Sequence, residues 1–192
     1  MTEDEKKMLV LYGAALYIIV FTFIEFLQHN TEFLFYTFIM GALILLLMRN
    51  NEKLHLNVFS VMSLVLIGAM HILAGNLHVY GQRLYDVQLL TWLRMDNVVH
   101  LLASILLGIV MYKLIREYAP NITSRLALFV LVILAVSGIG AINEIGELIT
   151  VIYFNAAAQV GNYLNNALDL VFNLIGAIIG FCIARLSIPH TA

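Results

Sequence analysis

Long apolar runs alternate with short polar segments along the whole chain. Each run approaches the about 20 residues that a helix needs to cross a bilayer, and both prolines, Pro120 and Pro189, fall outside these runs. The pattern predicts six transmembrane helices, at residues 8–28, 32–49, 57–75, 97–117, 125–153 and 164–186. We therefore expect an all-α, polytopic membrane protein whose single domain, residues 1–192, is a six-helix bundle.

The composition agrees with this fold class, since 62% of the 192 residues are hydrophobic and only 11% are charged. A net charge of −2 without a basic cluster argues against a nucleic-acid partner. Lys and Arg give the orientation, because cytoplasmic loops are enriched in them. With the N-terminus inside, eight of the ten lie on the cytoplasmic side and only Arg83 and Arg94 lie outside. We therefore expect both termini in the cytoplasm, and place the protein in a prokaryotic cytoplasmic membrane.

Ionisable residues within the predicted helices are the main functional signal. Acids at bilayer depth are costly and usually functional. Glu144 and Glu147 share one helix face because they are spaced i, i+3, and Asn166, Asp169 and Asn173 form a polar stripe on the next helix. Under the expected topology, ionisable residues of other helices lie at the same depth, towards the outer leaflet: Glu25, His29, His71, Asp96 and His100.

This layer predicts a metal site. Four ionised carboxylates need counter-charge in a low-dielectric site, either from shared protons or from one or two divalent ions. Carboxylate and imidazole ligands without thiolate suit Zn, Mn or Fe. The predicted metal ligands are His71, His100, Glu144, Glu147 and Asp169. Asp96, spaced i, i+4 from His100, would orient that ring, and Asp96 or Glu144 would act in catalysis.

Several polar residues have a second interpretation. For Glu25, His29, Asn165 and Asn173 we favour hydrogen bonding between helices, although Asn166 and Asn173 would also support the ligands. Asp96 stands at a helix start and would serve equally as an N-cap. Loop aromatics in residues 76–95 favour an interfacial belt. The same loop would also serve as a lid, with Arg83 or Arg94 binding an anionic headgroup.

Three classes of function fit these residues. The first is a metal-dependent membrane hydrolase acting on a lipid or amphiphile from the outer leaflet, with a carboxylate as general base for a metal-activated water. The second is a small proton-coupled transporter, which the apolar inner halves of the helices disfavour. The third is a non-catalytic protein that binds a lipid or a partner. Small residues would allow close helix packing, within the bundle or in a homo-oligomer: Gly176, Ala177 and Gly180.

Five motifs resemble the YjdF-like (DUF2238) membrane proteins: His71-Ile-Leu-Ala-Gly75, Tyr85-Asp86, Asp96-Asn-Val-Val-His100, Glu144-Ile-Gly-Glu147 and Asp169-Leu-Val-Phe-Asn173-Leu-Ile-Gly176. The last three are also similar to a wider VanZ-like pattern. The resemblance covers residues 57–180 and implies a polytopic bundle. It departs before Asp169, where Asn162, Asn165 and Asn166 replace an acid-rich segment. VanZ-like proteins are associated with glycopeptide antibiotic resistance, so this resemblance implies envelope or lipid chemistry.

Overall fold

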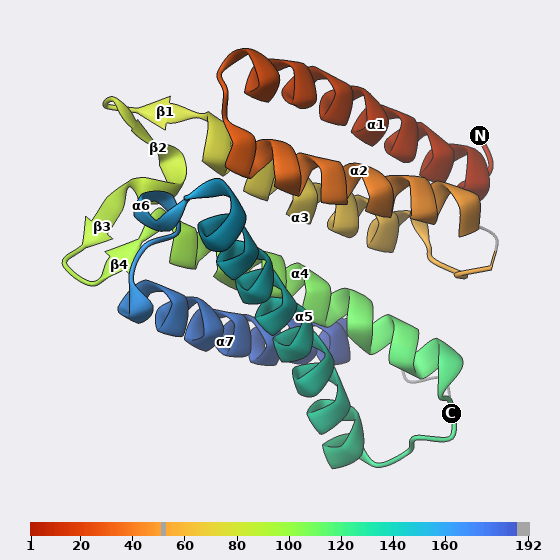
Figure 1. Ribbon diagram of the computed structural model, residues 1–192. Coiled ribbons are helices and arrows are strands. Elements are labelled where there is room, and N and C mark those ends of the chain that lie inside the picture. The colour runs from red at the N-terminus through yellow and green to blue at the C-terminus, as the bar shows by residue number, and fades with distance from the viewer. Residues whose placement is uncertain (51–52, 188–192) are drawn as a thin grey trace. The chain divides into compact units, whose positions relative to one another are not determined.

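The computed structural model describes residues 1–50 and 53–187, and most of them are helical (Figure 1). Six helices are long and apolar enough to cross a membrane, which confirms the predicted polytopic all-α fold. They are α1 (Glu3–Leu27), α2 (Thr31–Asn50), α3 (Val58–Asn76), α4 (Met95–Tyr118), α5 (Arg125–Phe154) and α7 (Tyr163–Ser187). A single turn, α6 (Ala157–Val160), precedes α7. The orientation of the termini stays a prediction.

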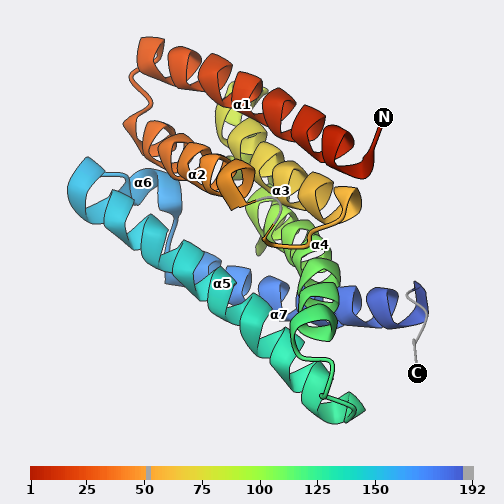
Figure 2. The same ribbon diagram turned by 90° about the vertical axis from the view of Figure 1, so that its right-hand side faces the viewer.

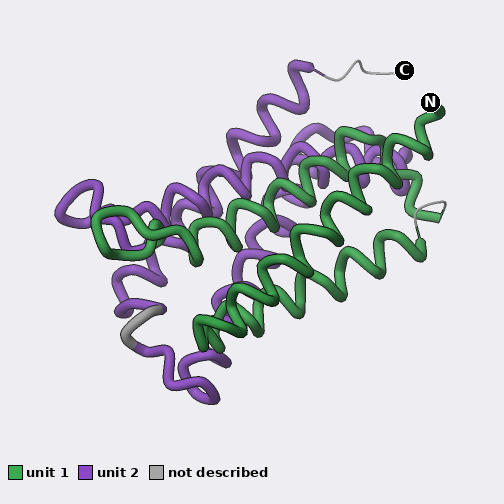
Figure 3. The backbone as a smooth tube through the Cα atoms, turned by 90° about the horizontal axis from the view of Figure 1, so that it is seen from above, with its two compact units in different colours: residues 1–85 green, residues 86–192 purple. Residues whose placement is uncertain are grey.

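The chain divides into two compact units, residues 1–85 and 86–192, which Figure 3 shows in separate colours. Each unit contains three of the six long helices found in residues 1–50 and 53–187. The single domain of residues 1–192 stays a prediction.

In the first unit, α1, α2 and α3 pack against one another. α1 begins at Glu3, earlier than expected, because Thr2 and Glu5 form a capping box at its N-terminus. After α3 the chain forms a short hairpin, β1 (His78–Val79) and β2 (Gln82–Arg83). Its two-residue loop, Tyr80–Gly81, has positive φ at both positions, as a tight antiparallel turn requires.

In the second unit, η1 (Leu84–Asp86, which starts before the boundary) and a hairpin of β3 (Gln88–Leu90) and β4 (Leu93–Arg94) lead directly into α4. α7 crosses α4 in close contact, and α5 packs against both (Figure 2). Glycines permit the close crossing: a Cβ at Gly176 would lie 2.6 Å from the Leu101 carbonyl oxygen, and one at Gly108 would lie 3.2 Å from Gly180 Cα. The expected role of the small residues in helix packing is therefore seen within this unit.

An apolar core lies beside the crossing. It consists of Tyr112, Leu128, Val132, Val136, Ala177, Phe181 and Ala184. The aromatic ring of Phe181 meets that of Tyr112 edge-on, with the centroids 5.7 Å apart. This core fixes the three helices at the end opposite to the polar residues described next, because those residues lie in the first turns of α4 and α7 and the later turns of α5.

Candidate metal centre

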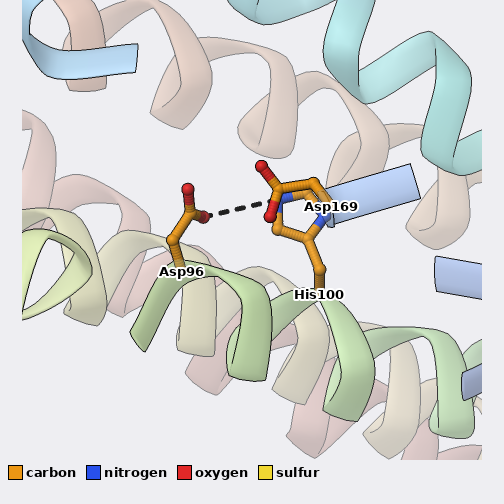
Figure 4. Close-up of side chains that lie close together, drawn as sticks. All are labelled: Asp96, His100 and Asp169. Atoms are coloured by element: carbon orange, nitrogen blue, oxygen red, sulfur yellow. Dashed lines mark ion pairs between the residues drawn. The ribbon is translucent and has the colours of Figure 1, made fainter. Parts of the chain in front are cut away.

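Three helices of the second unit bring ionisable side chains together. α4 carries Asp96 and His100 one turn apart, and Figure 4 shows Asp169 of α7 beside them. α5 carries Glu144 and Glu147 on one face. These five residues, called here the carboxylate–imidazole group, form two sets that share His100, one with both aspartates and one with both glutamates. In each set the potential ligand atoms lie within 4.8 Å of one another.

The His100 ring is buried, and its Nε2 atom faces three carboxylates. Asp96 Oδ1 lies 3.4 Å from Nε2, and oxygens of Glu147 and Asp169 each lie 3.9 Å from it. Asp169 is fully buried, and both other carboxylates are mostly screened from solvent. Three carboxylates around one ring nitrogen need either shared protons or a positive charge among them, because water is largely excluded from the site.

The other ring nitrogen determines what Nε2 can do. Nδ1 lies 3.3 Å from Asn173 Oδ1, which also accepts a hydrogen bond of 2.8 Å from the Ser104 hydroxyl. An amide oxygen only accepts, so Nδ1 carries the hydrogen in this contact. In a neutral His100 the Nε2 atom then holds a lone pair directed towards the carboxylates, as a metal-ligating imidazole does when its second nitrogen is held by an acceptor.

Two buried asparagines hold the aspartates of the group. Asn165 Nδ2 donates to Asp96 Oδ2 at 2.9 Å and to Asp169 Oδ2 at 3.0 Å. Asn97 Nδ2 donates to Asp169 Oδ1 at 2.7 Å, and its own side-chain oxygen accepts from the backbone N–H of Arg94 at 2.8 Å. Both aspartates are thus oriented by amides and not by cationic side chains. Neutral donors fix the carboxylates without cancelling their charge.

The two glutamates differ in their partners. Asn143 Nδ2 donates to Glu147 Oε1 at 3.1 Å. Both oxygens of Glu144 are buried atoms with no hydrogen-bond donor among residues 1–50 and 53–187. His100 Nδ1 lies 3.9 Å from Glu144 Oε1. Buried carboxylate oxygens without donors leave acceptor capacity that a cation would satisfy.

The spacing of the group fits a shared ion. Zinc lies about 2.1 Å from nitrogen and oxygen ligands, so two ligands at a tetrahedral angle lie about 3.4 Å apart. The distances from His100 Nε2 to its three carboxylates, 3.4 to 3.9 Å, fall close to this value. A hard or borderline divalent ion suits the oxygen and imidazole donors. The residues present therefore fit a divalent metal.

The structure brings together most of the predicted ligands. His100, Glu144, Glu147 and Asp169 all belong to the group, and so does Asp96. Asp96 is not the N-cap of α4, because Arg94 occupies that position and Asp96 lies in the first turn. Its carboxylate instead accepts from Asn165 and approaches His100, which agrees with the predicted role in orienting the ring.

Two other predicted site residues lie in the first unit. His71 Nδ1 is hydrogen-bonded to the Tyr85 hydroxyl, and His71 is in neither ligand set found in the described part of the chain. Arg83 forms an ion pair of 3.0 Å with the largely buried Glu32, and its guanidinium lies over the Phe33 ring. Tyr85 is therefore a buried partner of His71, whereas Tyr80 and Trp92 are exposed as an interfacial belt requires.

Of the asparagines predicted to support the ligands, Asn173 lies against His100 Nδ1, whereas the contacts expected of Asn166 are made by Asn165, for which hydrogen bonding between helices was favoured. Asn165 makes the bonds to the aspartates, while Asn166 is half-buried and its backbone N–H continues the helix. Asn97 and Ser104 were not expected to contribute. Their spacing on α4, one turn either side of His100, could have predicted that they share its helix face, because i±3 and i±4 neighbours do so.

Comparison with known proteins identifies the family. A model described as predicted membrane protein (DUF2238) matches residues 8–188. The chain belongs to the DUF2238 family. No curated protein and no solved structure matches it. The DUF2238 match extends beyond the expected residues 57–180 and includes the helices of both units. The VanZ-like similarity stays a prediction.

Proposed function

We propose that this DUF2238 protein binds one or two divalent metal ions through the carboxylate–imidazole group and acts as a metal-dependent hydrolase. The observation that carries the proposal is the environment of His100. Its Nε2 atom faces three carboxylates within 3.9 Å, and its Nδ1 atom is held by an amide oxygen. A lone pair facing several carboxylates is relieved by a cation or by protons held among them, and a divalent cation relieves it with a single group.

The proposed ligands are His100, Glu144, Glu147 and Asp169, with Asp96 either ligating or orienting His100. A divalent ion held there would activate a bound water and polarise an oxygen of the substrate. Asn97 and Asn165 keep the aspartates in place while leaving their negative charge available. Glu144, whose oxygens have no donor in the described chain, would either ligate the ion or, if left unligated, accept a proton from a reacting water.

The substrate in this proposal is a lipid or another amphiphile, and the centre lies towards the outer leaflet. The six membrane-spanning helices support a substrate drawn from the bilayer. The centre occupies the start of α4 and of α7, whereas the expected cytoplasmic cations Lys113, Arg116 and Arg185 lie near their other ends. This polarity supports a site on the side opposite to the cytoplasm.

Elemental analysis of protein purified without chelator and without metal-affinity resin tests the proposal. We expect one or two equivalents of Zn, Mn or Fe in the wild type, and loss of the metal in His100→Ala and Glu147→Ala. Glu117→Ala is the matched control, because Glu117 is an exposed acid on the same helix as His100. His71→Ala should keep its metal, because His71 belongs to neither ligand set found among the described residues.

The opposite result would refute the metal function. Wild-type protein that remains free of metal after reloading would mean that protons balance the acids, as in a proton-coupled transporter. Metal retained in both His100→Ala and Glu147→Ala would place the ion elsewhere. Metal bound as proposed, but without turnover of any lipid in a panel of outer-leaflet lipids, would identify a binding protein and not an enzyme.

A further inference from the structure

A cavity of about 450 Å³ lies in the second unit beside the carboxylate–imidazole group. Its wall is formed by the β3–β4 hairpin and by the segment that begins α7. Asn165 lines the cavity and also donates to Asp96 and Asp169. Asn165 in the cavity wall therefore also holds two carboxylates of the proposed metal centre.

Arg94 supplies the positive charge in this cavity. Its side chain is 18% exposed, and Nη2 is paired with Asp86. Among the described residues no other acceptor contacts the guanidinium, which has five N–H donors. A Cβ at position 161 would lie 2.7 Å from Nη1, so Gly161 leaves the space in which the guanidinium lies. A mostly buried cation with unused donors suits an oxyanion.

The rest of the lining is amphipathic. Gln88, Thr91 and Asn162 offer neutral polar groups, while Trp92 and Leu164 are 51% and 56% exposed at the surface. A lining that combines polar groups and exposed apolar side chains around a mostly buried cation fits a molecule with a polar head and an apolar body. Tryptophan at this position is typical of the interface between headgroups and acyl chains.

We propose that the cavity binds the phosphate headgroup of an amphiphile, with the phosphate held by Arg94. The guanidinium fork donates two parallel hydrogen bonds to phosphate oxygens. A phosphate has further oxygens, and an ion held by the neighbouring carboxylate–imidazole group would supply a second positive charge for them. This inference rests on the proposed function, because it names the substrate class of the same centre.

Binding of short-chain lipids to the detergent-purified, metal-loaded protein tests the proposal. Dihexanoyl phosphatidylglycerol, the uncharged dihexanoylglycerol and inorganic phosphate are titrated separately, and binding is followed by calorimetry. We expect the phosphatidylglycerol to bind at least about tenfold more tightly than the diacylglycerol, because a hydrogen bond to a charged group contributes about that much. If inorganic phosphate binds as tightly as the phosphatidylglycerol, so that the acyl chains add no affinity, the proposal that the ligand is an amphiphile fails.

Paired variants separate recognition from misfolding. Arg94→Gln should weaken phosphatidylglycerol binding at least about tenfold, whereas Asp86→Asn should strengthen it, because it releases Arg94 from its carboxylate. A merely damaged fold would weaken binding in both. Trp92→Ala should reduce binding of the lipid and leave that of inorganic phosphate unchanged. Arg125→Gln, at an exposed arginine of α5, is the matched control.

The metal content of each variant distinguishes this inference from the proposed function. If Arg94→Gln keeps its metal and binds phosphatidylglycerol as the wild type does, the headgroup assignment fails and the metal centre stands. If a dihexanoyl lipid with a carboxylate headgroup binds as tightly as the phosphatidylglycerol, the assignment of a phosphate headgroup also fails. If the wild type holds no metal yet Arg94→Gln loses lipid binding, the metal function fails and the headgroup site stands.

Discussion

Gly176 lies where α7 passes close to α4, and its replacement by alanine should disturb both stability and metal binding. A Cβ at this position would lie 2.6 Å from the Leu101 carbonyl oxygen and 2.7 Å from Ser104 Cβ. Ordinary contact begins near 3.4 Å, so the helices must separate by about 0.8 Å. Overpacking of this kind costs about 1–3 kcal/mol, and alanine returns about 0.5–1 kcal/mol of helix stability. The net destabilisation is then about 0–2.5 kcal/mol, with a middle value of about 1 kcal/mol.

The same separation would reach the metal centre. Asn173 stands one turn before Gly176 on α7, and its Oδ1 atom lies 2.8 Å from the Ser104 hydroxyl across the helix contact. An added 0.8 Å or so would lengthen this bond beyond the hydrogen-bond range. His100 would then lose the group that fixes its Nδ1 atom. Loss of such an outer partner typically lowers metal affinity about 10–100-fold.

Thermal unfolding and metal titration of a graded glycine series check this reasoning. Gly138→Ala is the control, because a Cβ on this residue of α5 would meet no heavy atom within 4 Å. Gly108→Ala is intermediate, with its nearest contact at 3.2 Å. We expect the unfolding midpoint to fall in the order Gly138→Ala, Gly108→Ala, Gly176→Ala. A Gly176→Ala protein as stable as Gly138→Ala, with unchanged metal affinity, would refute the argument.

Three further predictions follow from the polar contacts. Asn97→Ala should lower metal affinity about 10–100-fold, because Asp169 loses the donor that orients it; an unchanged titration would contradict this. Glu25→Gln should keep the unfolding midpoint, because the glutamine carbonyl oxygen still accepts hydrogen bonds from Thr37 and Asn76. The new amide group adds a donor to a site where Asn76 Oδ1 is unpaired. Glu25→Ala should lose about 2–4 kcal/mol by leaving those donors unpaired around a cavity, and equal midpoints for the two variants would disprove the contacts. The wild type should release metal as the buffer is acidified, because protons compete for carboxylate and imidazole ligands; elemental analysis after dialysis at graded pH checks this, and metal content that is independent of pH would argue against those ligands.

The sequence predicted the helices and much of the group because both depend on local periodicity. Apolar runs of bilayer length define the six helices. The spacings between Asp96 and His100 and between Glu144 and Glu147 place each pair on one face of its own helix. Pairs of this kind can be predicted without knowledge of the tertiary structure. Their meeting across α4, α5 and α7 was inferred only from a shared depth in the membrane.

Tertiary packing decides what periodicity leaves open. Asn165 and Asn166 both fit a stripe with Asp169 and Asn173, since spacings of three and four residues share a face. Only the contact of α7 with α4 selects Asn165, which then reaches Asp96. His71 illustrates the same limit. Its depth suggested a place among the ligands, but depth does not determine the direction of a side chain, and its ring is held by Tyr85.

A count of charges distinguishes two ways of offsetting the negative charge of the group, a bound metal and shared protons. The group holds four carboxylates and one imidazole, so without metal a protonated His100 offsets one acid and three acids must carry protons to reach neutrality. Each protonated carboxyl is then a donor that needs an acceptor in a buried site. Glu144 has no hydrogen-bond partner of either kind in the described chain, so a proton on it would leave a buried donor unpaired. Two divalent ions would instead use the oxygens of Glu144 as ligands and offset all four acids, and one ion would offset two of them, which is why the metal is the stronger of the two explanations.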